Sequence, residues 1–143
     1  MTDLIVRPLA PAITLISLDR PDARNAYSVA MIDALCAALD AAEDDDTIRC
    51  VIVTGEGSSF SAGGDLKLMR DRQGMFAGDP TTLRTQYMRH IHRVPRRLAR
   101  FDKPIIAAIN GPAVGAGLDL ACMCDFRIAS DRAKMGSTFV SVG

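Results

Sequence analysis

Two stretches of this sequence share one arrangement, and together they restrict the folds open to the chain. VIVTGEGSSFSAGGDL (51–66) and IIAAINGPAVGAGLDL (105–120) each begin with a short apolar run that ends near a glycine. A loop follows, and a group of small residues then precedes a segment of helical character. Buried strands that alternate with helices are typical of α/β proteins with a largely parallel sheet. We therefore expect an α/β fold in which two similar loops connect strands to helices.

The first third of the chain shows the two periods that distinguish strands from helices. Residues 12–18 are apolar and rich in branched side chains, which indicates a strand that ends at the turn-like residues 19–24. Ser28 is placed to cap a helix with one buried stripe. The apolar residues of that stripe are Met31, Ile32, Leu35, Cys36, Leu39 and Ala42. Residues 49–54 then form a short apolar run, as expected of a strand covered on both faces.

The middle of the chain is predicted to be mostly helical. Asp65 is placed to cap a short helix that ends at Met69, and residues 71–80 indicate a loop. A second helix is predicted from Thr81 toward Val94. Pro95 either kinks this helix or lies in the first turn of a new one, because proline lacks a donor and clashes with the preceding turn.

The last third returns to the pattern of strand and helix. We expect a strand from residue 104, a helix over 114–124 and a buried strand over 125–130. Residues 138–143 have the character of an apolar strand with nothing after it to cover it. We therefore expect one domain over residues 1–143 that is incomplete.

Length and composition agree with a single globular domain that has a hydrophobic core. The chain has 143 residues, of which 48% are hydrophobic and 24% are charged. No stretch offers the roughly 18 apolar residues that a membrane helix needs, and the N-terminus lacks the pattern of a secretory signal. We therefore expect a cytoplasmic protein with no membrane partner.

Charge and cysteine content exclude several other classes. Seventeen basic residues balance seventeen acidic ones, so net charge predicts no polyanionic partner. The segment 84–103 carries seven basic residues and one acid, which indicates either an anion-facing surface or a solvated helix face. The four cysteines lack CxxC spacing, so we expect buried, reduced thiols and no metal site. They are Cys36, Cys50, Cys122 and Cys124.

The starts of the two predicted helices suit an oxygen that gains negative charge. Helix N-termini leave backbone N–H groups unpaired and carry the positive end of the helix dipole. Two of them directed at one point would form a two-donor hole for an oxyanion. The small residues could instead serve only close packing between helix and strand.

Three other glycine motifs are excluded by specific residues. Leu120 occupies the third glycine position of a dinucleotide-binding loop, and no GKS or GKT of a P-loop occurs. Ser61 lacks the first glycine of the GxSxG hydrolase elbow.

The residues at these loops carry a resemblance to a known family. FSAGGDLK (60–67) resembles the AGxDL signature of the crotonase (enoyl-CoA hydratase/isomerase) superfamily, and residues 103–130 are similar to its second signature. DRPDARNAYS (19–28) resembles the N-terminal strand and turn of the same family. The resemblance extends through essentially the whole chain in consistent order. By this resemblance the chain is identified as the N-terminal part of a crotonase-superfamily protein.

The resemblance implies a spiral of ββα turns that binds an acyl-CoA thioester. It implies assembly as a trimer or hexamer through helices beyond residue 143, and no cofactor besides the coenzyme A of the substrate. The backbone N–H groups of Gly64 and Ala116 would hold the thioester oxygen, and one well-placed donor is worth about 3 kcal/mol. Contacts to coenzyme A carry over to Arg24, Ala26, Ala62, Gly63, Gly64, Asp65, Leu66 and Lys67. Of these, Asp65 has a helix cap as its alternative role.

The resemblance also suggests which residue moves protons. Asp119 matches the position of the first catalytic glutamate of hydratases and of an aspartate in dienoyl-CoA isomerases. The alternative to a catalytic role for Asp119 is a structural role on the helix surface. The second hydratase glutamate would fall at Phe139, which transfers no proton. We expect His90 and His92 to be surface or structural residues. Double-bond isomerisation is therefore the first expectation and hydration the alternative. A third hypothesis is an inactive acyl-CoA-binding or RNA-binding relative, although no nucleic-acid partner is expected.

Overall fold

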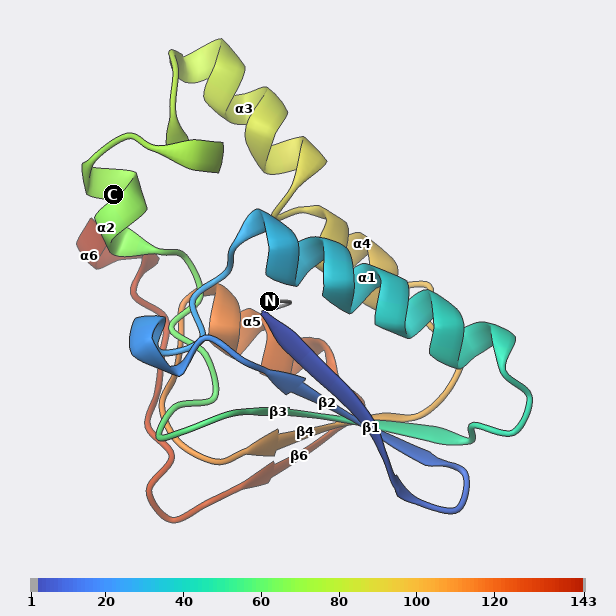
Figure 1. The fold of residues 1–143 in the computed structure, drawn as a ribbon. Helices are drawn as coiled ribbons and strands as arrows, with labels where there is room; N and C mark the ends of the chain where they lie inside the picture. Colours follow the sequence, from blue (N-terminus) through green and yellow to red (C-terminus); the bar gives the residue numbers. More distant parts are fainter. Residues whose placement is uncertain (1–2, 143) are drawn as a thin grey trace.

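The computed structural model describes residues 3–142, which form a five-stranded sheet with helices packed on one face (Figure 1). The order of the strands is β1-β2-β3-β4-β6. β1 and β2 are antiparallel, and the other neighbours are parallel, which confirms the predicted largely parallel sheet. The strands are β1 (Leu4–Ala10), β2 (Ile13–Leu18), β3 (Cys50–Gly55), β4 (Ile105–Ile109) and β6 (Phe126–Ala129).

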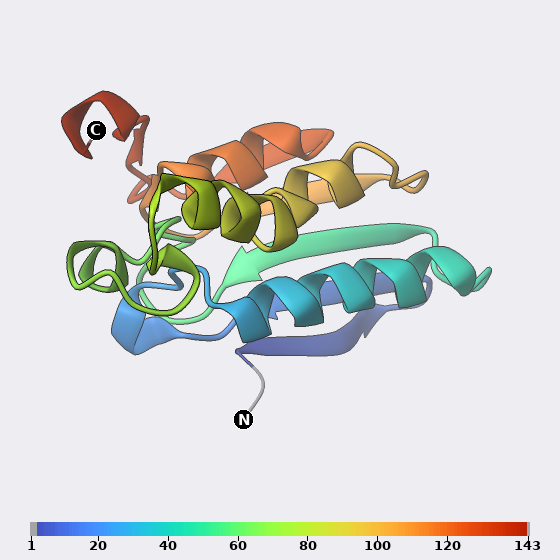
Figure 2. The same cartoon turned by 90° about the horizontal axis from the view of Figure 1, so that it is seen from above.

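The first helix, α1 (Val29–Asp44), is the one predicted from its apolar stripe. Ser28 caps it, since the Ser28 hydroxyl accepts a hydrogen bond of 2.9 Å from the Met31 N–H. All six residues of the predicted stripe are buried. Figures 1 and 2 together show α1, α4 (Arg93–Leu98) and α5 (Ala116–Met123) on the same face of the sheet. The hydrophobic core lies between these helices and the strands.

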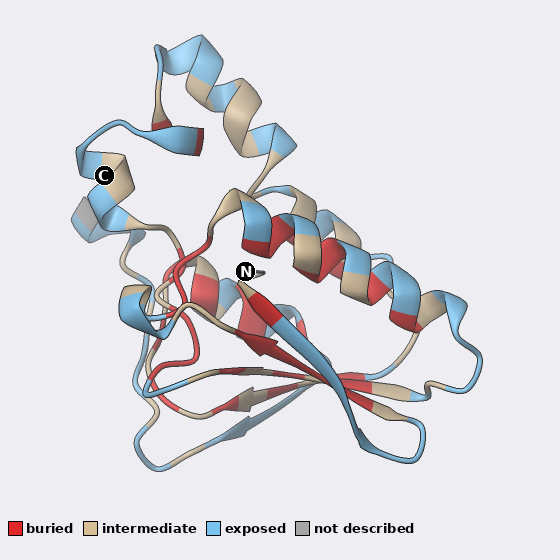
Figure 3. Cartoon of the chain, viewed as in Figure 1, coloured by how far each residue is buried: buried red, intermediate tan, exposed pale blue. Residues whose placement is uncertain are grey.

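The opposite face of the sheet is less buried than expected, both at β3, which the sequence predicts to be covered on both faces, and at β6. β3 and β4 alternate between buried and half-buried residues, and β6 is exposed at all four positions (Figure 3). Phe126 and Ile128 of β6 are 62% and 66% exposed. The expectation of a buried strand over 125–130 is therefore wrong, because β6 is an edge strand whose outer face no other element within residues 3–142 covers.

The middle of the chain agrees with prediction in its helices, including the predicted alternative of a helix that restarts with Pro95 in its first turn, and differs in the loop before them. Asp65 caps α2 (Leu66–Arg70) as predicted. The second predicted helix is two helices, α3 (Pro80–Arg89) and α4, and Pro95 lies in the first turn of α4. The predicted loop over 71–80 contains the 3-10 turn η2 (Gly74–Phe76), whose Phe76 ring packs edge-on against Tyr87 of α3 at 5.9 Å.

The last described residues contradict the prediction of a strand over 138–143. Residues 139–142 form the short helix α6 (Phe139–Val142), and Gly143 lies outside the described residues. Before α6, β5 (Ala113–Val114) and β7 (Met135–Gly136) pair in a small second sheet. The chain then turns so that Phe139 lies next to Gly115, at 4.0 Å from the position a Cβ would take there.

One strand, β1, was not predicted, and one of the four cysteines is exposed, contrary to expectation. The sequence did not predict β1, because Leu4 is its only buried residue and its other apolar side chains are exposed. All four thiols are free, and Cys36 and Cys124 are buried as expected. Cys122 is exposed, so the expectation that it is buried is wrong. The neighbouring residue Ala121 is the one that α5 buries. No helix within residues 3–142 has the length and apolar character to cross a lipid bilayer.

Candidate active site

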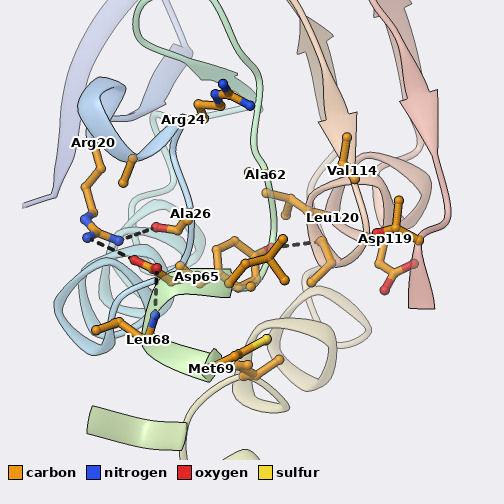
Figure 4. A pocket seen from close by; sticks show the side chains of 18 of the residues that line it. Arg20, Arg24, Ala26, Ala62, Asp65, Leu68, Met69, Val114, Asp119 and Leu120 are labelled. Carbon is orange, nitrogen blue, oxygen red and sulfur yellow. Dashed lines mark hydrogen bonds and ion pairs between the residues drawn. The ribbon is translucent and has the colours of Figure 1, made fainter. Parts of the chain in front are cut away.

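A cleft of about 1740 Å³ opens where the two glycine-containing loops end (Figure 4). The turn at 20–27, the loop before α2, the start of α5, and residues of α3, α4 and α6 line it. Every predicted site residue except Gly63 lies on its wall. These are Arg24, Ala26, Ala62, Gly64, Asp65, Leu66, Lys67, Ala116 and Asp119.

The two loops touch each other directly. Ser61 bridges to Ala113, and the Val114 N–H donates a hydrogen bond of 2.9 Å to the Ser61 carbonyl. Gly63 has a φ of +73°, and a Cβ there would lie 2.7 Å from the Ala116 nitrogen. Gly63 therefore lies buried behind the cleft wall and packs against the start of α5, and close packing accounts for its lack of a side chain. The same contact brings Gly64 and Ala116 side by side on the wall.

The backbone N–H groups of Gly64 and Ala116 have no acceptor within residues 3–142. Ala116 is the first residue of α5, and no side chain caps this helix. Unpaired N–H groups at a helix start, together with the helix dipole, attract negative charge. The cleft wall therefore includes two residues, from two adjacent loops, whose backbone donors have no partner among the described residues.

Asp119 supplies a carboxyl group to the same wall. It lies in the first turn of α5, where its N–H donates to the Gly115 carbonyl at 3.0 Å. Its side chain is exposed to the cleft, yet the surrounding protein displaces part of its water and raises the pKa of the carboxyl above its ordinary value. A raised pKa brings a carboxyl closer to the range in which it can both accept and return a proton.

The side chain of Asp65 is fully engaged with protein groups. One oxygen accepts the Leu68 N–H at 3.2 Å and so caps α2, while the other pairs with the Arg20 guanidinium at 3.5 Å (Figure 4). Arg20 also donates to the Ala26 carbonyl at 2.7 Å, and so connects the first turn to the loop before α2. Sequence reasoning missed Arg20, although it lies within the turn that carries the resemblance.

Asn25 is a second residue that sequence reasoning missed. It is fully buried, and its amide donates to the carbonyls of Glu56 and Ser59 at 2.9 and 2.8 Å. Its oxygen accepts the Arg20 N–H at 2.8 Å. The turn formed by η1 (Pro21–Ala23) and Asn25 is thereby fixed to the end of β3.

The rim and the wall of the cleft differ in chemistry. Arg24 and Lys67 lie exposed on the rim, and neither forms an ion pair within residues 3–142, so both are available to an anionic ligand. The wall is mostly apolar. It includes Leu68, Met69, Tyr87, Ile91, Val94, Leu120, Met123 and Phe139.

The two histidines lie in different environments. His90 is half-buried and shares a hydrogen bond of 3.0 Å with the Gln86 side chain. His92 is exposed but reaches the cleft wall, where its ring lies edge-on to Tyr87 at 6.1 Å.

Two arginines of the basic segment 84–103 pair with acidic residues of α1. Arg93 pairs with Asp33, and Arg97 pairs with Asp40 and Glu43. Hydrogen bonds from the Asp102 N–H and from Arg97 lower the pKa of the Glu43 carboxyl. Part of the positive charge of this segment therefore holds α4 against α1.

Comparison with known proteins now defines the class. A family model described as enoyl-CoA hydratase/isomerase matches residues 10–143, so the chain belongs to this family. The solved structure of an enoyl-CoA hydratase from Bacillus anthracis superimposes with a TM-score of 0.85 at 30% identity, over 99% of this chain and 52% of that chain. The crotonase fold expected from the sequence is thereby confirmed.

Two curated relatives from Escherichia coli (strain K12) carry different reaction names. The 2,3-dehydroadipyl-CoA hydratase is 36% identical over 143 residues, which is all of this chain and 52% of the relative. The 1,2-epoxyphenylacetyl-CoA isomerase is also 36% identical over 143 residues, which is all of this chain and 53% of the relative. The chain spans about half the length of the curated relatives it matches. Equal similarity to a hydratase and to an isomerase leaves the reaction to be argued from the cleft.

Proposed function

We propose that this chain forms the acyl-CoA-processing core of an enzyme in which the Gly64 and Ala116 N–H groups bind a thioester oxygen. The observation that carries the proposal is the meeting of these two unpaired donors at one cleft. Removing a proton next to a thioester carbonyl creates an oxyanion, and each donor directed at it is worth about 3 kcal/mol.

The rim of the cleft suits the coenzyme A portion of such a substrate. Arg24 and Lys67 carry the free positive charge that its phosphates need. Ala26, Ala62 and Leu66 would contact the rest of the arm, while Gly63 and Asp65 hold the loop in shape. By family resemblance we further propose a cytoplasmic trimer or hexamer that uses no cofactor besides this coenzyme A.

Double-bond isomerisation is the reaction that the acid–base groups favour. One carboxylate, Asp119, can take a proton from one carbon of the bound acyl group and return it to another, which leaves the substrate's composition unchanged. Addition of water needs a second positioned acid, and Phe139 presents an apolar ring at the cleft where that acid is expected. Hydration remains the alternative within the class.

Incubation of the purified protein with 2-enoyl-, 3-enoyl- and dienoyl-CoA in heavy water, followed by mass spectrometry, tests the proposal. Isomerisation predicts deuterium uptake without the added mass of water. Products heavier by one water would favour hydration. Binding with neither deuterium uptake nor a shifted double bond would favour an inactive acyl-CoA-binding protein. Absence of both binding and turnover across the panel would overturn the proposal.

A further inference from the structure

Tyr27 contacts both loops that supply the free N–H groups. Its side chain is 2% exposed and forms part of the cleft wall. Its backbone N–H donates to the Gly63 carbonyl at 2.7 Å, and its hydroxyl donates to the Ala116 carbonyl at 3.2 Å. One residue is therefore hydrogen-bonded to both halves of the site.

The bond to Gly63 fixes the direction of the Gly64 N–H. The Gly63 carbonyl and the Gly64 N–H belong to one planar trans peptide, so they point in opposite directions. Holding the carbonyl inward with the Tyr27 N–H turns the Gly64 N–H outward, toward the cleft that Gly64 lines.

The bond to Ala116 fixes the first turn of α5. No side chain caps this helix, so the Tyr27 hydroxyl is a contact that ties its first turn to the first glycine loop. Burial, and secondarily the charge of Asp119, raise the pKa of Tyr27, which keeps the hydroxyl protonated as a donor.

We propose that Tyr27 is a positioning residue that sets the separation and angle between the Gly64 and Ala116 N–H groups. The inference rests on the proposed oxyanion hole. Donors must lie within about 0.5 Å of the productive geometry to act together, so loss of the hydroxyl should weaken the hole while leaving the coenzyme A contacts in place.

Butyryl-CoA labelled with ¹³C at the thioester carbonyl is the probe for this inference. A saturated thioester does not isomerise, so its carbonyl resonance reports polarisation by the hole without turnover. We expect binding to the wild-type protein to shift this resonance. Tyr27→Phe should lose about half of the shift, because one donor of two is displaced. The Kd for butyryl-CoA should change less than about threefold.

Thr54→Val is the matched control. The Thr54 hydroxyl likewise donates to a backbone carbonyl, that of Ala108 at 2.8 Å, but outside the cleft. This variant should keep the full carbonyl shift, and thermal unfolding of both variants separates loss of stability from loss of polarisation. An equal loss of shift in Thr54→Val would overturn the positioning role.

The failure of each proposal has its own signature. If the wild-type protein binds butyryl-CoA without any carbonyl shift, the oxyanion hole itself is absent. If the wild-type shift is present and Tyr27→Phe retains all of it, the hole stands and the role of Tyr27 is overturned.

A measurement on the wild type keeps the inference testable if Tyr27→Phe does not fold. Binding of the thioester oxygen to the Gly64 N–H polarises the shared peptide and strengthens the bond from the Tyr27 N–H to the Gly63 carbonyl. Saturation with butyryl-CoA should therefore slow hydrogen exchange of the Tyr27 amide. Unchanged exchange at saturation would contradict the inference.

Discussion

The two glycine-containing loops look alike in sequence, yet they lead into helices that begin in different ways. Each contains the dipeptide Asp-Leu. In the first loop, Asp65 precedes α2 and its side chain caps that helix. In the second, Gly115 precedes α5, and Asp119 lies one turn inside it with no part in capping.

This difference separates the electrostatic roles of the two loops. The Asp65 carboxylate accepts a hydrogen bond from an N–H group at the start of α2 and neutralises the positive end of that helix. The start of α5 keeps its unpaired N–H groups and its positive end. Negative charge that develops in the cleft is therefore drawn toward α5, and the first loop adds a single donor, Gly64, from outside its helix.

The largest expected effect concerns Asp119, the acid that is free of capping. Asp119→Asn keeps the shape but cannot accept a proton, so turnover should fall by about 10² to 10⁴, which corresponds to about 3 to 5 kcal/mol in the barrier. Acyl-CoA binding and thermal stability should be unchanged. Burial disfavours the charged form of Asp119 in the folded protein, so removing that charge costs no stability. Steady-state rates and calorimetric Kd values are the measurements; an unchanged rate would assign Asp119 a structural role.

The contact between the loops is the next target. Gly63→Ala would place a methyl group 2.7 Å from the Ala116 nitrogen at a φ of +73°, so we expect a loss of about 3 kcal/mol in the free energy of unfolding. Gly74→Ala is the control, since Gly74 also has a positive φ, +58°, but no atom lies within 4 Å of its Cβ position. It should cost only about 1 kcal/mol. Equal losses in urea unfolding would show that the loops do not pack as described.

The capping acid should have a smaller effect on stability than this contact. Asp65→Ala removes the cap of α2 and the pair with Arg20, at a cost of about 1 to 2 kcal/mol. Asp79→Ala, which removes the analogous cap of α3, is the control. Both variants should be destabilised in thermal unfolding, but only Asp65→Ala should weaken acyl-CoA binding; equal binding in the two would separate Asp65 from the site.

The smallest effect is a displacement of the pH profile. The folded structure raises the pKa of Asp119, so its carboxylate form is lost as pH falls through a value above the usual Asp value of about 3.9. Activity that needs the carboxylate should therefore decline at a higher pH than an ordinary aspartate would give. The measurement is kcat/KM against pH, and an acid limb at or below the usual value would contradict the role of Asp119 as base.

Local pattern was sufficient for the elements whose signals lie within one turn or one strand. Ser28 and Asp65 cap helices as their positions predict, and the apolar stripe of α1 is buried residue for residue. Prediction failed where the outcome depends on neighbours remote in sequence. β6 has the composition of a buried strand but lies at an edge, and residues 139–142 form a helix beside Gly115 although their composition suits a strand.

The sequence by itself determined the alternation of strands and helices, the two glycine loops and the family, because periodicity, caps and motifs are local properties. Only the tertiary structure decided that Gly63 serves packing while Gly64 and Ala116 face the cleft. It also revealed Arg20, Asn25 and Tyr27, whose partners lie far along the chain. The Tyr27 hydroxyl and the Ala116 carbonyl are 89 residues apart in sequence, and no local pattern encodes a hydrogen bond across that separation.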